Sequence, residues 1–155
     1  MADEAQTGLT GGCQCGAVRY RLDAKPKATS ICHCRMCQKA SGGPFTAFGG
    51  LRLVRLVWTR GAPKVFASSD IAERGFCAQC GTPLTYRGLG SEHISVTLGS
   101  LDDPDAVGPA AQLGVESRLR WLAGALSAPE TRTEQWLARV KIAQVRNRQH
   151  PDRET

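Results

Sequence analysis

The seven cysteines of the chain fall into three tight clusters, and this grouping constrains the fold more than any other feature. The clusters are Cys13-Gln14-Cys15, Cys32-His33-Cys34-Arg35-Met36-Cys37 and Cys77-Ala78-Gln79-Cys80. A disulfide framework spreads its cysteines and uses an even number, whereas two thiolates so close in sequence can occupy two corners of one metal tetrahedron. Four thiolates close a structural zinc site, and three leave a coordination position open. The pattern therefore predicts one zinc that holds the fold and one that can do chemistry.

The N-terminal sequence favours metal binding over disulfides, because it predicts a reducing compartment. Asp3 and Glu4 stand where a secretory signal peptide has basic residues, and no apolar segment follows them. No stretch approaches the roughly 18 consecutive apolar residues of a membrane span. We therefore expect a cytoplasmic protein with no membrane partner, whose thiols stay reduced. A redox-active pair at Cys77 and Cys80 is less favoured, because the glycine and proline that follow predict a turn and not a helix N-terminus.

Length and charge indicate one small, mildly basic domain. A chain of 155 residues is long enough for one hydrophobic core, and its 17 glycines indicate many turns. The formal net charge of +6 counts every cysteine as neutral. Zinc with four thiolates carries −2 and zinc with three carries −1, which lowers +6 to +3 in the loaded protein. That charge is weak support for a nucleic-acid partner and suits a small anionic substrate.

Short alternating segments between glycines and prolines predict a mainly β fold. In residues 17–22, Val18, Tyr20 and Leu22 share one face, and the apolar residues of 93–98 alternate in the same way. Besides these two strands, residues 51–58 are rich in β-favouring residues, and we expect short strands at 64–67 and 84–86. Residues 28–31 are expected to lead, in an extended conformation, into the second cysteine cluster. Residues 1–10 are expected to form a disordered lead, and residues 11–125 the zinc-binding domain.

Residues 126–155 are expected to form a helical tail. Thr131 and Glu134 have the spacing of a capping box, which predicts a helix from about Thr133 to Asn147. The apolar face of this helix consists of Trp136, Leu137, Val140 and Ala143, and the opposite face is basic, with Arg132, Arg139, Lys141, Arg146 and Arg148. The basic face suits a nucleic acid or an acidic partner. A solvated face on a terminal helix that packs through Trp136 is the simpler explanation, and we favour it.

Four motifs resemble those of one known family. The first is residues 11–20, which begin Gly11-Gly12-Cys13-Gln14-Cys15-Gly16, and the second joins the central cysteine cluster to Ala40-Ser41-Gly42-Gly43-Pro44-Phe45. The third contains Arg74-Gly75-Phe76-Cys77-Ala78-Gln79-Cys80-Gly81-Thr82-Pro83-Leu84, and the fourth is Gly99-Ser100-Leu101-Asp102-Asp103-Pro104. Across residues 11–105 the chain resembles the glutathione-dependent formaldehyde-activating enzymes, a family that shares its domain with centromere protein V.

The resemblance implies a zinc-bound β-sheet fold similar to the Mss4-like fold, and it assigns the cysteines to two sites. Cys13, Cys15, Cys77 and Cys80 would hold the structural zinc, and Cys32, Cys34 and Cys37 would hold the catalytic zinc. The spacing alone leaves this partition open, because Cys34 and Cys37 could equally complete a four-thiolate site with either other pair. The implied activity is that of a carbon–sulfur lyase or synthase. Glutathione, the thiol partner, adds to formaldehyde to give S-hydroxymethylglutathione, or the adduct is cleaved.

Residues near the second site have less specific roles. We expect His33 to be structural, since in an extended segment its side chain points away from the two flanking cysteines. Arg35 and Lys39 are placed to attract the carboxylates of glutathione, or they are ordinary surface charges. Arg74 and Ser69 are expected to be structural.

One segment departs from the family pattern. Gln112-Leu113-Gly114 stands where the resemblance leads us to expect a histidine and an aromatic residue, which leaves the identity of the thiol open. The alternative function is a non-enzymatic zinc module that binds a partner, through the basic C-terminal helix.

Overall fold

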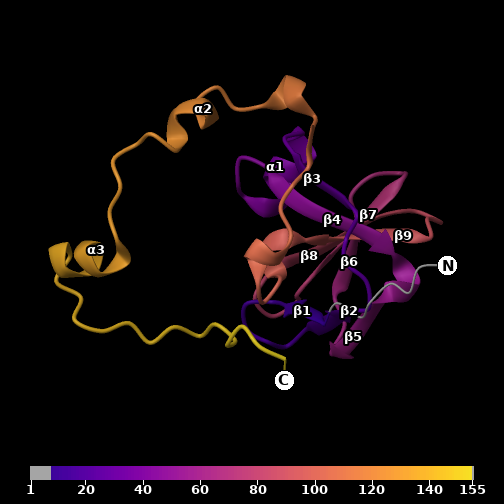
Figure 1. Cartoon of the computed structure of the whole chain (residues 1–155), viewed down its shortest axis with the longest axis horizontal. Coiled ribbons are helices and arrows are strands. Elements are labelled where there is room, and N and C mark those ends of the chain that lie inside the picture. The colour runs from indigo at the N-terminus through magenta and orange to yellow at the C-terminus, as the bar shows by residue number, and fades with distance from the viewer. Residues whose placement is uncertain (1–7, 155) are drawn as a thin grey trace.

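The computed structural model describes residues 8–154 and consists mainly of two β-sheets (Figure 1). One sheet has the strand order β1-β2-β5, and the other has the order β10-β3-β4-β9-β8-β7-β6. All paired strands are antiparallel except β10 and β3. The strands are β1 (Leu9–Gly12), β2 (Arg19–Leu22), β3 (Ala28–Cys32), β4 (Thr46–Arg52), β5 (Leu56–Arg60), β6 (Lys64–Ala67), β7 (Ala72–Phe76), β8 (Pro83–Gly88), β9 (His93–Thr97) and β10 (Ala111–Leu113).

Helical structure is confined to short segments. The α-helices are α1 (Arg35–Ser41), α2 (Leu122–Ala125) and α3 (Thr133–Arg139), and the 3-10 turns are η1 (Leu53–Arg55), η2 (Leu98–Ser100), η3 (Pro104–Ala106) and η4 (Val115–Ser117). The mainly β fold with two cysteine clusters and short C-terminal helices confirms the predicted Mss4-like fold class. Each expected strand segment contains or overlaps a strand. The expected lead is too long, because Leu9 and Thr10 belong to β1; its residues 1–7 lie outside the described residues.

The hydrophobic core draws side chains from both sheets. Leu22 of β2, Leu84 of β8 and Val96 of β9 are fully buried in it. Cys13 and Cys77 belong to the same core, with exposed fractions of 2% and 1%. A metal held by these two thiols is therefore an extension of the core, which is why its loss should affect the whole domain.

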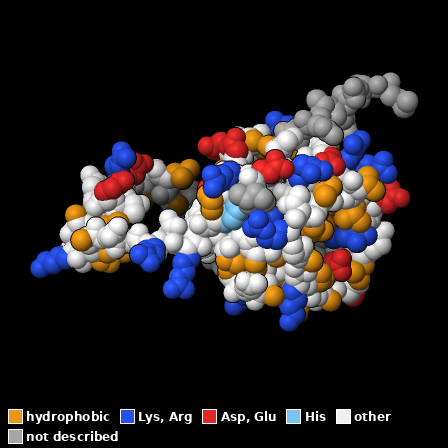
Figure 2. All heavy atoms as spheres, turned by 90° about the horizontal axis from the view of Figure 1, so that it is seen from below, with side chains coloured by type: hydrophobic (Ala, Val, Ile, Leu, Met, Phe, Trp, Pro, Cys, Tyr) orange, Lys and Arg blue, Asp and Glu red, His pale blue; other side chains and the backbone are white. Residues whose placement is uncertain are grey.

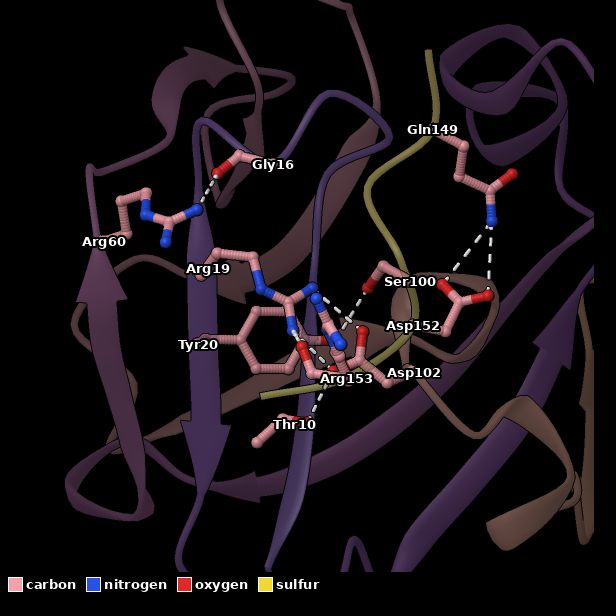
Figure 3. Close-up of polar contacts among 10 residues, drawn as sticks. All are labelled: Thr10, Gly16, Arg19, Tyr20, Arg60, Ser100, Asp102, Gln149, Asp152 and Arg153. Carbon is pink, nitrogen blue, oxygen red and sulfur yellow. Dashed lines mark hydrogen bonds and ion pairs between the residues drawn. The ribbon is translucent and has the colours of Figure 1, made fainter. Parts of the chain in front are cut away.

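A buried polar network ties the first sheet to the loop after β9 (Figure 3). Arg19 of β2 donates to Asp102 over 2.9 Å, and the Tyr20 hydroxyl lies 2.7 Å from the Ser100 hydroxyl. Thr10 of β1 donates to the same carboxylate. The bonds of Arg19 and Tyr20 thus join the first motif of the sequence to the fourth.

The chain after β10 does not form the long helix that the sequence predicts. α3 ends at Arg139, and Lys141 adopts a left-handed conformation with φ of 58°. Trp136 is 50% exposed, so the predicted packing through this residue is wrong as well. Figures 1 and 2 show the segment with α2 and α3 standing apart from the sheets. An amphipathic pattern that meets no surface lacks the packing that stabilises most short helices in water.

The predicted capping box is also displaced by one residue. The Gln135 side chain accepts a hydrogen bond from the Arg132 backbone N–H at 3.1 Å, in place of the expected pairing of Thr131 with Glu134. Beyond the helix the chain is extended and returns to the first cysteine turn. The His150 N–H donates to the Gln14 carbonyl at 2.7 Å, and the Arg153 carbonyl accepts from Arg19 at 2.9 Å (Figure 3).

Candidate metal centres

Four cysteines meet where the β1–β2 turn approaches the β7–β8 turn. The sulfurs of Cys13, Cys15, Cys77 and Cys80 all lie within 4.8 Å of one another. The Cys13–Cys15 and Cys15–Cys77 sulfur distances are 3.6 Å and 3.8 Å. Zinc–sulfur bonds of about 2.3 Å in a tetrahedron place sulfurs about 3.8 Å apart, whereas a disulfide needs about 2.05 Å. The donor set and its spacing therefore fit a zinc ion.

Backbone groups hold these sulfurs in place. The Val18 N–H donates to the Cys13 sulfur at 3.2 Å, and the Gln79 N–H donates to the Cys77 sulfur at 3.4 Å. Gly81, with φ of 78°, turns its N–H back to the Cys77 carbonyl at 2.9 Å. The turn predicted after Cys80 is present, and N–H groups directed at sulfur stabilise negative charge there.

Thr82 connects the two turns, a role that the sequence analysis did not assign. Its hydroxyl accepts from the Gln14 N–H at 3.0 Å and lies 3.1 Å from the Cys80 sulfur. Burial opposes ionisation of the Cys80 thiol, but hydrogen bonds from Thr82 and from Cys15 outweigh it and lower the pKa of Cys80 to about 6. This thiol is thus prepared to bind a metal as thiolate near neutral pH.

The other three cysteines meet where β3 runs into α1. Cys32 is the last residue of β3, Cys34 is the N-cap of α1, and Cys37 lies in the first turn of the helix. Their sulfurs also lie within 4.8 Å of one another, and no fourth His, Cys, Asp or Glu of residues 8–154 joins the group. The structure thus separates the cysteines into four and three, as the resemblance implies, and three thiols leave one zinc position for another ligand.

The thiols of this second cluster differ in electrostatic environment. Burial raises the pKa of the Cys37 thiol to about 12, although a hydrogen bond from Arg74 acts in the opposite direction. Burial also opposes ionisation of Cys34, but the Cys37 backbone N–H and the neighbouring thiols outweigh it and lower the pKa of Cys34. Metal binding must therefore release a proton from Cys37, so the affinity of this site should depend on pH.

β10 covers one side of the three-cysteine cluster. Leu113 is the register partner of Cys32, and its carbonyl accepts from the His33 N–H at 2.8 Å. The His33 ring is fully buried, packs edge-on against Phe45 and bonds to the Gln112 side chain at 3.0 Å. These contacts agree with the structural role expected for His33. Gln112, in the segment that departs from the family pattern, provides the partner for that ring.

Substitution of Gly114 is expected to disturb the second cluster specifically. Gly114 has φ of 62°, and a Cβ atom there would lie 2.7 Å from the Cys34 backbone nitrogen. Gly114→Ala should therefore cost roughly 1–3 kcal/mol and weaken metal binding by the three cysteines. Competition with a zinc chelator measures this, with Gly108→Ala as control because no atom lies within 4 Å of that position. Equal affinity in both variants would contradict the expectation.

A cavity of about 480 Å³ lies between α1 and strands β4 and β6 to β9. It adjoins the three-cysteine cluster through Arg74, which lines the cavity and contacts the Cys37 sulfur. It contains two cations, Lys39 and Arg74, and none of its lining residues is acidic. Its apolar wall is formed by Met36, Phe48, Phe66, Phe76 and Pro83. Such a cavity suits a small anionic ligand with an apolar part.

Of the other charged and polar candidates, Lys39 and Arg74 line the cavity, whereas Arg35 and Ser69 make local hydrogen bonds. Of the two expected cations, Lys39 lines the cavity, whereas Arg35 bonds to the Gln38 side chain at 3.1 Å. Ser69 accepts from the Ile71 N–H in the β6–β7 turn, in agreement with a structural role. Arg74 is the residue that the sequence analysis placed least well, because its guanidinium lies 3.4 Å from the Cys37 sulfur. Only the sheet register reveals this contact.

The fold and the two cysteine clusters define a mainly β protein with two groups of thiols that could each hold a metal ion. A family model described as glutathione-dependent formaldehyde-activating enzyme matches residues 8–117, and the chain belongs to this family. None of the helices between residues 8 and 154 combines the length and hydropathy that a membrane span requires.

Similar proteins agree with this assignment at low identity. A Schizosaccharomyces pombe protein named an uncharacterized lyase is 34% identical over 76 residues, which cover 49% of this chain and 55% of that protein. A Halomonas elongata protein named "Putative glutathione-dependent formaldehyde-activating enzyme" is 30% identical over 84 residues, covering 49% and 54%. The chain therefore spans about half the length of these curated relatives. A Rhodobacter sphaeroides crystal structure matches 66% of this chain and 98% of its own, with a TM-score of 0.52 and 23% identity, which shows the fold alone.

Proposed function

We propose that this protein is a zinc-dependent carbon–sulfur lyase or synthase that acts on the adduct of a glutathione-type thiol and formaldehyde. Cys13, Cys15, Cys77 and Cys80 hold the structural zinc, and Cys32, Cys34 and Cys37 hold the catalytic zinc. The observation that carries the proposal is a three-thiol cluster, with no fourth ligand among the described residues, beside a cavity with two cations. Structural zinc sites normally have four protein ligands, whereas catalytic zinc sites have three and leave the fourth position to water or substrate. A substrate thiol can occupy that fourth position here.

The reaction itself is simple. In the synthetic direction the substrate sulfur attacks the aldehyde carbon, the π electrons of the C=O bond move to oxygen, and water protonates that oxygen. Cleavage is the reverse. Bound zinc supplies the charge that keeps a thiol ionised near neutral pH.

The residues of the chain contribute binding and orientation. Cys32, Cys34 and Cys37 fix where the substrate sulfur is presented, and β10 shields one side of that position. Lys39 and Arg74 attract an anionic adduct into the cavity. Because the uncatalysed addition is itself easy, the main effect expected of the protein is to hold two reactants in the correct geometry.

Cobalt substitution tests whether a thiol joins the three cysteines. Each added thiolate intensifies the sulfur-to-cobalt charge-transfer absorption, so glutathione should strengthen this band in the wild type and do so much less in Cys34→Ser. S-methylglutathione, which lacks a free thiol, is the matched control and should have no effect. NMR exchange spectroscopy of formaldehyde, glutathione and their adduct should show faster interconversion than in protein-free buffer. A band indifferent to glutathione, with no rate enhancement, would favour the non-enzymatic zinc module instead.

A further inference from the structure

Arg74 occupies the junction between the three-cysteine cluster and the cavity. It lies in the middle of β7, in register with Phe66 of β6 and Tyr86 of β8. Its guanidinium carbon is 5.0 Å from the centroid of the Tyr86 ring, and one terminal nitrogen donates to the Cys37 sulfur at 3.4 Å. The ring and the sulfur hold a planar cation in one orientation, with the cavity on its open side.

The charge of Arg74 is not matched by an acid. An arginine stays protonated at all relevant pH values, and a partly buried cation commonly pairs with a carboxylate. Among residues 8–154, the guanidinium makes a hydrogen bond to the Cys37 sulfur and a ring contact with Tyr86, and its Nε is buried without a hydrogen-bond partner. A buried N–H donor of this kind needs an acceptor, and Arg74 lines the cavity through which an acceptor can arrive.

Proximity to Cys37 indicates which acceptor it is. A substrate thiol that joins the three cysteines brings the oxygen of its adduct, two bonds from the sulfur, into the neighbourhood of the nitrogen that contacts Cys37. The carboxylates of a glutathione-type thiol are several bonds farther from the sulfur. Lys39, on the exposed face of α1 at the cavity wall, has the long flexible side chain that suits such a distant charge.

We propose that Arg74 binds the oxygen of the thiol–aldehyde adduct, an inference that rests on the proposed function. As the S–C bond forms, the π electrons of the aldehyde become a lone pair on oxygen, and the guanidinium stabilises that negative charge. Water supplies the proton that completes the hydroxyl group, because arginine does not release its own. In cleavage the hydroxyl proton passes to water and the guanidinium holds the alkoxide; the C=O bond then re-forms as the S–C bond breaks and its electron pair stays on the thiolate sulfur. Donors aimed at a developing oxyanion act in this way in other enzymes.

Two readouts separate binding of the thiol from stabilisation of the oxygen. Arg74→Gln should leave the glutathione-dependent cobalt band unchanged within about twofold, because the thiol still reaches the cysteines. The same variant should lose roughly 10²- to 10³-fold of any rate enhancement at saturating glutathione, the usual effect of removing one oxyanion donor. Arg74→Lys should recover part of that loss. Lys39→Gln removes the other cation of the same cavity and, because Lys39 is assigned to a distant carboxylate, should act mainly by raising the glutathione concentration for half saturation, whereas Arg74→Gln should act mainly on the saturated rate.

Four outcomes would overturn the inference. An Arg74→Gln variant as fast as the wild type would show that the adduct oxygen does not need this residue. Weaker glutathione titration with an unchanged saturated rate would assign Arg74 to a carboxylate of the thiol. Loss of cobalt or of cooperative unfolding in both Arg74→Gln and Arg74→Lys would make it a structural residue. A wild type with neither the cobalt response nor rate enhancement would overturn the proposed function, and this inference with it.

Discussion

Cys77→Ser is expected to abolish cooperative folding, while Cys32→Ser leaves the fold nearly intact. Cys77 is 1% exposed and part of the core, and its sulfur is one of four in a closed cluster. Zinc bound at structural sites of small domains contributes about 10–16 kcal/mol, as much as the whole net stability of a typical domain. Serine is nearly isosteric with cysteine, so the loss of stability in Cys77→Ser reports the loss of a metal ligand and not the creation of a cavity. Cys32 is half-buried at the end of β3. The Cys32→Ser substitution should therefore lower the free energy of unfolding by only about 1 kcal/mol.

Circular dichroism melts with zinc and a reductant distinguish these variants. The Cys77→Ser protein should show no cooperative transition, and Cys32→Ser should melt within several degrees of the wild type. The metal content of the Cys32→Ser protein should fall to about one zinc per chain. Equal loss of stability in both variants would show that the structural and catalytic assignments of the two clusters are wrong.

The features that sequence analysis identified are those with a local signal. Cysteines two or three residues apart are close in space whatever the tertiary fold, so candidate metal ligands could be recognised without coordinates. The alternating residues of β2 and β9 likewise report which face of a strand is buried. Which cysteines form the group of four and which the group of three has no local signal, and only the resemblance provided that assignment.

The missed features depend on contacts between distant segments. β10 is exposed along its whole length and is a strand only because its backbone pairs with β3. The position of Arg74 near Cys37 follows from a register that places it beside Tyr86. The length of the C-terminal helix was overestimated because its amphipathic pattern is strong locally but lacks a tertiary contact to stabilise it. Trp136 is half-exposed and packs on no surface of the described chain. Local sequence thus identified the clustered cysteines better than the residues that surround them.

Asp102→Asn should cause the second largest loss of stability. The Asp102 carboxylate accepts hydrogen bonds from Arg19 and Thr10, and the side chains of Arg19 and Asp102 are 3% and 10% exposed. Removing one partner of a buried ion pair leaves the other charge uncompensated, which costs roughly 3–5 kcal/mol. Urea unfolding at pH 7 measures this, with Asp105→Asn as control because that side chain is exposed in the same loop. A loss below 1 kcal/mol would show that the pair contributes little.

The pH dependence of this difference gives an independent check. Burial raises the pKa of the Asp102 carboxyl, but hydrogen bonds from Arg19 and Thr10 outweigh it and hold the pKa below its usual value. The unfolded chain therefore binds a proton at higher pH than the folded one, with an ordinary pKa of about 4. The stabilisation is complete above that pH and is lost as the pH falls through the lower pKa of the folded state. Zinc loss in acid affects both proteins, so the measured quantity is the difference in unfolding free energy between wild type and Asp102→Asn. That difference should shrink below about pH 4, and a difference that stays constant into the acid range would exclude the ion pair as its cause.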